Sequence, residues 1–457
     1  MTLLPHRCRN ALALIRSLAL LVMLTGVALK AGAADDSEQE RYGGKFQFTY
    51  NWQQHLSFKG IEGSRNSLSR TDEHMFTMSA TAHLGARLWD GAEVYFDPEI
   101  ASGVPFSGAL VGLGSFTNGE ITRAGGADPK YYRQRLFLRQ TWNNGGGTQK
   151  VESDFNQLAG SVDRDRFVLT IGNFSTLDVF DDNNYAKDPR TQFMNWGHWT
   201  YAAYDYAADA RGFGWGLAGE WYKDDWVVRF GRMTGPRVPN GLPTDYRIWK
   251  HYGDQLEIEH GHTLNGQPGK VRLLGWRNRA VTASFKDALA YYTANEGTQG
   301  FDPETILQVR HGEKIKYGLG INLEQAINDQ IGVFLRAMQA DGRTETYAFT
   351  EVDASLSLGV MAQGSAWGRE RDSAGVAFGM NRLSDPRRRY LESGALSFFI
   401  GDGSLSYAAE KNVELFYSLG LIKGTWLTAD YQHIENPAYN SSRGPVNVFA
   451  FRFHAEY

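Results

Sequence analysis

The sequence predicts an all-β fold, a transmembrane antiparallel β-barrel of about sixteen strands whose third outer loop folds inward. Three observations support this fold class. Long stretches alternate between apolar and polar residues, short connections alternate with long ones, and the chain ends on an amphipathic run that closes with the aromatic Tyr457. Nothing after Leu29 offers about 20 successive apolar residues, so the remaining chain has no candidate transmembrane helix.

The alternation has the period of two that a β-strand requires, and it is longer than in most soluble strands. In residues 45–59 one face is bulky and largely aromatic, while the other carries Lys, Gln, Thr, Asn and His. The pattern recurs in 75–88, 314–325 and 347–360. A one-sided sheet in a soluble sandwich also alternates, but its polar faces are seldom so long or so rich in Gly and Ser. The pattern therefore favours a barrel with lipid outside and water inside.

Counting such runs predicts about sixteen strands, an even number, as bacterial single-chain barrels require. They are expected at 45–59, 75–88, 92–101, 133–142, 165–174, 212–222, 225–233, 254–262, 270–279, 314–325, 330–340, 347–360, 372–382, 411–420, 424–434 and 446–457. The last run has an aromatic final residue, which is the feature that outer-membrane insertion machinery typically recognises.

The connections between these runs provide an independent test. If both termini are periplasmic, every second connection should be a short turn and the others long outer loops. The short ones are 89–91, 223–225, 265–269, 328–329 and 423–424, and the long ones are 102–132, 175–211, 234–253, 280–313 and 382–410. The connection 143–164 is too long for a plain turn, so either the turn is elaborated or the strand count is off by a pair. Residues 280–295 have helical spacing and predict a short helix within a loop.

The N-terminus predicts a signal peptide, residues 1–33, followed by one barrel domain, 34–457. A basic head precedes the apolar run Ser17–Leu29, and Ala31-Gly32-Ala33 supplies the small-x-small pattern of a cleavage site. Cys8, the only cysteine, lies in this segment, so disulfide, zinc-thiolate and cysteine-nucleophile chemistry are not expected in the mature chain.

Charge and composition narrow the possible partners. The predicted signal peptide holds four of the 47 basic residues and none of the 51 acidic ones, which leaves 43 against 51 and a net charge of −8. This balance argues against nucleic acid as a partner. The 12 Trp, 22 Tyr and 26 Phe are suited to aromatic girdles at membrane interfaces, although secreted carbohydrate-binding proteins have similar values. For the predicted barrel, outer-membrane lipid is the expected surrounding.

Charged residues of both signs are expected on the inner wall. About sixteen strands enclose an aqueous passage instead of a packed core. Interleaved charges create a transverse field and offer bidentate hydrogen bonds to vicinal hydroxyls, although any lumen wall must be polar. The strand phases place these residues inward: Arg87, Arg135, Arg139, Arg229, Arg272, Arg336, Glu93, Tyr95, Asp97, Glu99, Glu220, Glu257 and Glu351.

The connection 175–211 is the third outer loop of such a barrel, the loop that commonly folds inward to set the constriction. It combines carboxylates, arginines and aromatic rings, among them Asp181, Asp188, Arg190, Trp196 and His198. Rings cover the apolar faces of a pyranose and charged groups bond its hydroxyls, so this composition is suited to a sugar site. The alternative is that the acidic residues form Asx turns and the rings pack the loop against the wall.

Motifs for other chemistry are absent from the sequence. Asp178-x-x-Asp181-Asp182-Asn183-Asn184 suggests calcium, but it lacks the glycine and the terminal glutamate of a dedicated calcium loop. No His-x-x-x-His pair lies on a predicted helix, and neither a Gly-x-Ser-x-Gly nor a phosphate loop occurs. No metal, no cofactor and no enzymatic activity are expected.

Several motifs are similar to those of the carbohydrate-selective porin (OprB) family of bacterial outer membranes. They include Val168-Leu-Thr-Ile-Gly-Asn-Phe-Ser175, Tyr185-Ala-x-Asp188-Pro-Arg190, Gln192-Phe-Met-Asn-Trp196 and Tyr206-Ala-Ala-Asp209-x-Arg211-Gly212. The resemblance extends over nearly the whole mature chain. It implies a sixteen-stranded porin that passes small sugars without energy input, with arginines and acidic residues along its pore.

The leading hypothesis is passive diffusion of small carbohydrates through a polar lumen with a charged and aromatic constriction. The candidate substrate-binding and pore-lining residues are Arg87, Glu93, Asp97, Arg135, Arg139, Arg229, Arg336, Asp181, Asp188, Arg190, Trp196 and His198. The nearest alternative is a general porin, or one selective for amino compounds or organic acids. An outer-membrane hydrolase and a purely structural barrel without a passage are more distant alternatives. Trimers are common among sixteen-stranded porins, so a homotrimer is a possible assembly, although the sequence identifies no trimer face.

Overall fold

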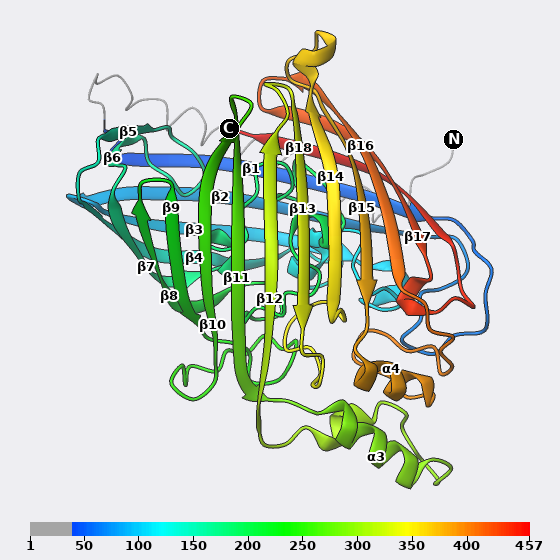
Figure 1. Cartoon of the computed structure of the whole chain (residues 1–457). Helices are drawn as coiled ribbons and strands as arrows, with labels where there is room; N and C mark the ends of the chain where they lie inside the picture. The colour runs from blue at the N-terminus through cyan, green and yellow to red at the C-terminus, as the bar shows by residue number, and fades with distance from the viewer. Residues whose placement is uncertain (1–38) are drawn as a thin grey trace.

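The computed structural model describes residues 39–457, so the predicted signal peptide lies outside the described residues. Sixteen strands form one closed antiparallel barrel, in which β18 pairs with β1 to complete the ring (Figure 1). The barrel strands are β1 (Tyr42–His55), β2 (Glu73–Trp89), β3 (Ala92–Val104), β4 (Lys130–Asn143), β7 (Arg166–Phe174), β8 (Gly214–Lys223), β9 (Trp226–Met233), β10 (Tyr252–Leu264), β11 (Gln267–Val281), β12 (Glu313–Ala326), β13 (Ile331–Ala340), β14 (Ala354–Gln363), β15 (Ser373–Arg382), β16 (Glu410–Ile422), β17 (Thr425–Glu435) and β18 (Val446–Glu456). The predicted fold class and strand number are confirmed.

The strands separate an apolar outer face from a polar inner face. In β18, Phe449 and Phe451 are exposed on the outside, whereas the alternate residues Arg452 and His454 are buried inside. Outer rings pair across neighbouring strands, as Trp52 on β1 does with Phe451, with ring centroids 6.3 Å apart. The period of two in the sequence is therefore the period of this two-faced wall. Within residues 39–457, no helix has the length and apolar character needed to cross a bilayer.

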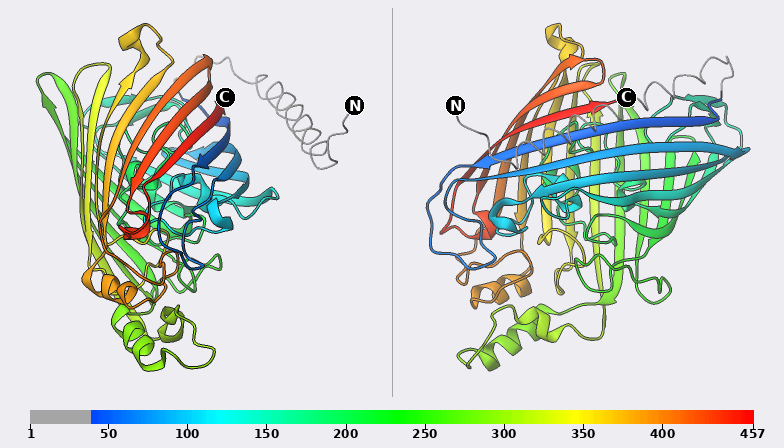
Figure 2. Two further views of the ribbon diagram at one scale, coloured as in Figure 1. Left: turned by 90° about the vertical axis from the view of Figure 1, so that its right-hand side faces the viewer. Right: turned by 180° about the vertical axis from the view of Figure 1, so that it is seen from behind.

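The two ends of the barrel differ in the length of their connections. At the turn end, two residues join β2 to β3, β8 to β9, β10 to β11 and β16 to β17. Asn265 and Gly266 both have positive φ (52° and 80°), the geometry of the two-residue turn that matches strand twist. The longest connections gather at the opposite, loop end, together with α3 (Phe285–Asn295) and α4 (Asp385–Glu392) (Figure 2). The C-terminus lies at the turn end (Figure 1).

The connection between β4 and β7 is an elaborated turn and does not change the strand count. Its short strands β5 (Thr148–Val151) and β6 (Gly160–Asp163) form a separate two-stranded sheet, while β4 pairs directly with β7. We refer to residues 144–165 as the turn hairpin.

The helices are short and lie in the connections. The helix predicted within 280–295 is α3, which begins after Ser284, whose hydroxyl accepts from the backbone N–H of Asp287. The helix α2 (Trp196–Trp199) lies in the connection 175–211. The 3₁₀ helices are η2 (Phe106–Gly108), η3 (Gly119–Arg123), η4 (Thr176–Asp178), η5 (Thr305–Val309), η6 (Gly364–Trp367) and η7 (Pro437–Tyr439).

One predicted strand boundary is wrong: β14 begins at Ala354, and not at residue 347. The backbone N–H groups of Tyr347 and Ala348 donate to the carboxylate of Asp205, and not to a neighbouring strand. Phe349 has a φ of 63° and packs on Trp196. The alternation before residue 354 therefore reflects the packing of a loop. Glu351 accordingly lies before the strand, where it is buried against Arg387.

Candidate functional site

The connection 175–211, which we call the inner segment, starts with a capping box that orients Asp178. The hydroxyl of Ser175 accepts from the backbone N–H of Leu177, and the Asp178 carboxylate accepts from the N–H of Ser175 at 2.9 Å. Asp178 also forms a bidentate pair with Arg135 of β4, with N–O distances of 2.7 and 2.6 Å. Burial alone would raise the pKa of Asp178, but the Arg135 guanidinium holds it below its ordinary value. This end of the segment is thus fixed to the wall by charge.

Inward side chains on the far side of the barrel hold the rest of the segment. Arg336 of β13 donates to the Asp181 carboxylate at 2.8 Å and to the backbone carbonyl of His198 at 2.8 Å. Glu257 of β10 accepts from the N–H of Asp181 at 2.9 Å. Arg452 of β18 donates to the carbonyls of residues 189 and 192, both at 2.8 Å. The segment therefore contacts the inner face of strands far apart around the ring.

The two aromatic candidates of the segment differ in their surroundings. Trp196 packs on Trp199 at 4.8 Å and on Phe349 at 4.9 Å between ring centroids, and it borders a cavity. His198 is fully buried, and its Nδ1 lies 2.8 Å from the hydroxyl of Ser357. Burial lowers the pKa of His198 to about 3, so its imidazole is neutral at any ordinary pH.

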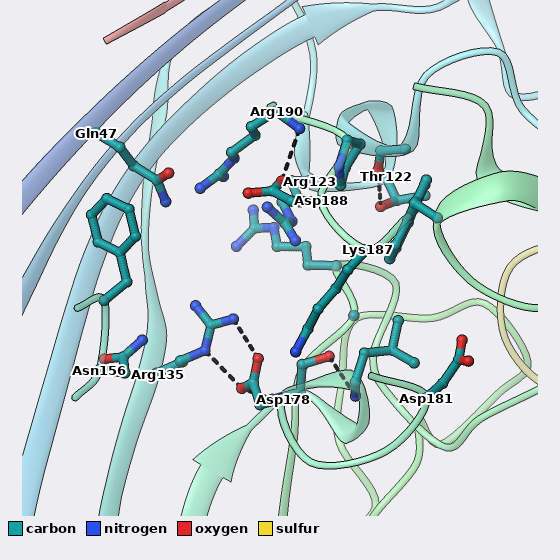
Figure 3. Close-up of a pocket in the computed structure, with 18 of the residues that line it drawn as sticks. Gln47, Thr122, Arg123, Arg135, Asn156, Asp178, Asp181, Lys187, Asp188 and Arg190 are labelled. Atoms are coloured by element: carbon teal, nitrogen blue, oxygen red, sulfur yellow. Dashed lines mark hydrogen bonds and ion pairs between the residues drawn. The ribbon is translucent and has the colours of Figure 1, made fainter. Parts of the chain in front are cut away.

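A loop-side cavity of about 410 Å³ lies between the inner segment and the wall of strands β1, β2 and β4 (Figure 3). Arg135, Asp178, Lys187, Asp188 and Arg190 surround its centre, as Figure 3 shows. The wall residues Gln47 and His83 and the rings of Trp196, Trp199 and Tyr206 also border it. The cavity thus combines charged donors, charged acceptors and flat rings.

A turn-side cavity of about 320 Å³ lies nearer the short turns. Arg87, Glu93, Arg166, Glu220 and Arg229 border it, all from strand positions close to the turn end. Four residues border both cavities, so the cavities meet there: Arg139, Gln157, Asp178 and Lys187.

Most of the charged residues on the border form ion pairs. Arg190 lies 2.8 Å from both Glu99 and Glu120. In the turn-side cavity, Arg87 pairs with Glu93 at 2.9 Å. Arg229 contacts three carboxylates at 2.9 to 3.1 Å, those of Glu220, Glu257 and Glu259. Such networks hold long side chains in place and present their remaining N–H groups in fixed directions.

Most of the candidate residues border one of the two cavities. The loop-side cavity is bordered by Arg135, Arg139, Asp181, Asp188, Arg190 and Trp196, and the turn-side cavity by Arg87, Glu93, Arg139 and Arg229. Asp97, Arg336 and His198 border neither. Asp97 accepts from Arg135 at 3.2 Å, while Arg336 and His198 lie where the inner segment meets the far wall.

Other bordering residues were not among the candidates. The turn hairpin contributes Phe155, Asn156 and Gln157, and the inner segment contributes Lys187. The unusual length of the 143–164 connection was the one signal for the hairpin, because a turn with no inward role needs few residues. Within residues 39–457, no group of three or more His, Cys, Asp or Glu side chains is placed to hold a metal ion.

Comparisons with known proteins bear on the fold and the family. The high-pH structure of Pseudomonas putida OprB is similar over 91% of this chain and 94% of that one, with a TM-score of 0.64 and 14% identity, which supports the fold. The outer-membrane channel DcaP of Acinetobacter baumannii matches 93% of this chain and 100% of that one, at a TM-score of 0.49 and 9% identity. No curated protein matches the sequence. The model of the carbohydrate-selective porin, OprB family, matches residues 65–457, most of the chain. The chain therefore belongs to the carbohydrate-selective porin (OprB) family of outer-membrane proteins.

Proposed function

We propose that small carbohydrates diffuse passively through the two cavities and are selected where the cavities meet. The observation that carries this proposal is the set of four residues, Arg139, Gln157, Asp178 and Lys187, that border both cavities. A solute that passes from one cavity to the other must move between these side chains. With the usual orientation of such barrels, the loop-side cavity faces the outside and the turn-side cavity the periplasm.

The inner segment forms the constriction from the loop end. It would have to lie within the lumen to do so, and its contacts with Glu257, Arg336 and Arg452 on the inner faces of β10, β13 and β18 support that position. The turn hairpin enters from the other end, where the backbone carbonyl of Asn156 accepts from Arg139 at 2.9 Å. Two connections from opposite ends therefore narrow one passage.

The border offers what a sugar requires. Guanidinium and carboxylate groups bond hydroxyls, and the rings of Trp196, Trp199 and Tyr206 provide flat apolar surfaces. The candidates away from the cavities act indirectly: Arg336 and His198 hold the inner segment, and Asp97 orients Arg135. Diffusion of this kind uses no cofactor and no energy source.

The direct test is conductance in planar bilayers while glucose and longer sugars are titrated onto the refolded mature protein. Sugars that enter the constriction should block the ion current saturably, because a bound sugar occupies the path of the ions. Steady current at every sugar concentration would instead favour the alternative of a general porin.

Loss of both wall arginines at the constriction should change ion selectivity. In Arg135→Ala/Arg139→Ala, two positive charges disappear and Asp178 and Asp97 lose a cationic partner, so selectivity should move toward cations. The pore should also widen, with a higher single-channel conductance. The reversal potential in a salt gradient measures the first effect, and an unchanged value would remove these arginines from the mechanism.

The mature assembly remains a separate proposal. We infer a homotrimer from the frequency of trimers among sixteen-stranded porins, and removal of residues 1–33 from the pattern of the signal peptide. Light scattering of the detergent-solubilised protein gives the number of chains, and N-terminal sequencing gives the cleavage site.

A further inference from the structure

Three arginines that border the cavities form no ion pair with a carboxylate. Within residues 39–457, Arg139, Arg166 and Arg211 border a cavity and have no carboxylate oxygen within 4.0 Å of the guanidinium. Where their side chains donate hydrogen bonds, the acceptors are neutral backbone carbonyls: that of Asn156 for Arg139, and those of Asp163 and Arg164 for Arg166. Three arginines without an ion-pair partner therefore border the passage.

Each of these guanidinium groups lies over an aromatic ring instead. Arg211 lies 4.3 Å from the ring centroid of Tyr132, and Arg166 lies 3.7 Å from that of Tyr222. Arg139 lies 5.4 and 5.3 Å from the rings of Tyr95 and Phe137. A ring holds a guanidinium in place without cancelling its charge, and it leaves the N–H groups at the edge free to bind a ligand.

The three arginines follow one another along the passage. Arg211 borders the loop-side cavity, Arg139 borders both cavities, and Arg166, the first residue of β7, borders the turn-side cavity. A solute crossing the barrel meets them in this order. Their placement is thus a series along the path, and not a single cluster.

The carboxylates that border the cavities do not offset this series. All but one of them pair with another cation: Asp178 with Arg135, Asp181 with Arg336, Asp182 with Lys187, Glu93 with Arg87 and Glu220 with Arg229. Only Asp188 lacks a cationic side chain within 4.0 Å among the described residues, and it accepts from the backbone N–H of Arg190 at 2.8 Å. Among the charged side chains that border the cavities, three arginines and one carboxylate therefore lack an oppositely charged group within 4.0 Å.

We propose that the passage prefers carbohydrates that carry a negative charge, such as hexuronates and sugar phosphates, over neutral sugars of the same size. The guanidinium edge bonds a carboxylate or phosphate with two parallel hydrogen bonds, while the rings beside it accommodate the sugar. Because the series runs along the path, the anion exchanges one arginine for the next and is not trapped at a single site. This inference rests on the proposed function and specifies its substrate class.

The test compares fluxes of labelled glucose, glucuronate and glucose 6-phosphate into liposomes that contain the refolded mature protein. Fixed charge in a narrow passage raises the entry rate of an opposite charge, so glucuronate should enter about tenfold faster than glucose. A preference for both anions indicates recognition of charge, and a preference for glucuronate alone narrows the class to sugar acids. Equal fluxes of glucose and glucuronate would overturn the inference. If no sugar crosses, the proposed function itself fails, which is a distinct result.

Variants tie the preference to the three arginines. In Arg139→Gln/Arg166→Gln/Arg211→Gln the ratio of glucuronate to glucose flux should fall about tenfold, to near one. The matched control is Arg133→Gln, because Arg133 also lies over a ring, 4.9 Å from that of Trp215, but borders neither cavity. The control should keep the wild-type ratio.

A single variant covers the case in which the triple variant does not refold. In Arg139→Gln alone, the reversal potential in a potassium chloride gradient should move toward that of a cation-preferring channel, while Arg133→Gln leaves it unchanged. A wild-type flux ratio in the triple variant, or a wild-type reversal potential in Arg139→Gln, would exclude these arginines as the source of the preference.

Discussion

Replacement of Arg336 by methionine is expected to release the inner segment and to raise the single-channel conductance. Arg336 is 1% exposed, and its guanidinium bonds both the carboxylate of Asp181 and the carbonyl of His198. Methionine fills much of the same volume but leaves Asp181 as a buried charge without its cation. Breaking a buried pair on one side costs about 3–5 kcal/mol. We expect the barrel to persist, because this cost falls on the attachment of the segment, and the strand ladder is unchanged.

Conductance traces and limited proteolysis measure this release. Arg336→Met should show larger and noisier openings, and the segment should become cleavable by protease from outside. Adding Asp181→Asn should recover part of the loss, because the unpaired buried charge is removed. Arg232→Met is the control. Arg232 pairs with Asp254 at 2.7 Å, both side chains are partly exposed (27% and 26%), and surface pairs contribute only about 0–1 kcal/mol. If both single variants behave alike, Arg336 does not hold the segment.

The architecture of the wall could be predicted because its signal is local. Alternate residues of a strand show which side faces lipid and which faces the lumen. The local sequence therefore predicts all sixteen strands near their observed positions without knowledge of their neighbours. The same rule failed at residues 347–353, where Tyr347 and Phe349 occupy alternate positions but contact the inner segment. A period of two cannot distinguish lipid on one side from a loop on that side.

Which inward residues border the cavities and which hold the inner segment could not be predicted, because this depends on contacts between distant parts of the chain. Arg139 and Arg336 have the same strand phase and the same chemistry. One borders both cavities, and the other is buried against a segment more than a hundred residues away in sequence. Strand phase indicates only that a side chain points inward. The contacts of that side chain inside the barrel depend on the path of the inner segment and of the turn hairpin.

Deletion of residues 148–163 is expected to open the passage from the turn end. The deletion joins Gly147 to Arg164, which are already adjacent, since the N–H of Arg164 donates to the carbonyl of Gly147 at 2.8 Å. The barrel should still close, because β4 pairs with β7 from Leu136 and Asn173 to Asn143 and Arg166 without the hairpin. Phe155, Asn156 and Gln157 no longer border the cavities, so the narrowest part of the passage widens.

Sugar block separates this widening from a general loss of structure. Each hydrogen bond that a sugar no longer makes costs about 1 kcal/mol, so the half-blocking concentration should rise about fivefold for each group lost. Gln157→Ala should show part of the effect, because Gln157 borders both cavities. Gln149→Ala, on an exposed arm of the same hairpin, should show none. Unchanged conductance and block in the deletion would mean that the inner segment alone sets the constriction. A wider, weakly blocked pore would mean that selection is shared between two connections that enter the barrel from opposite ends.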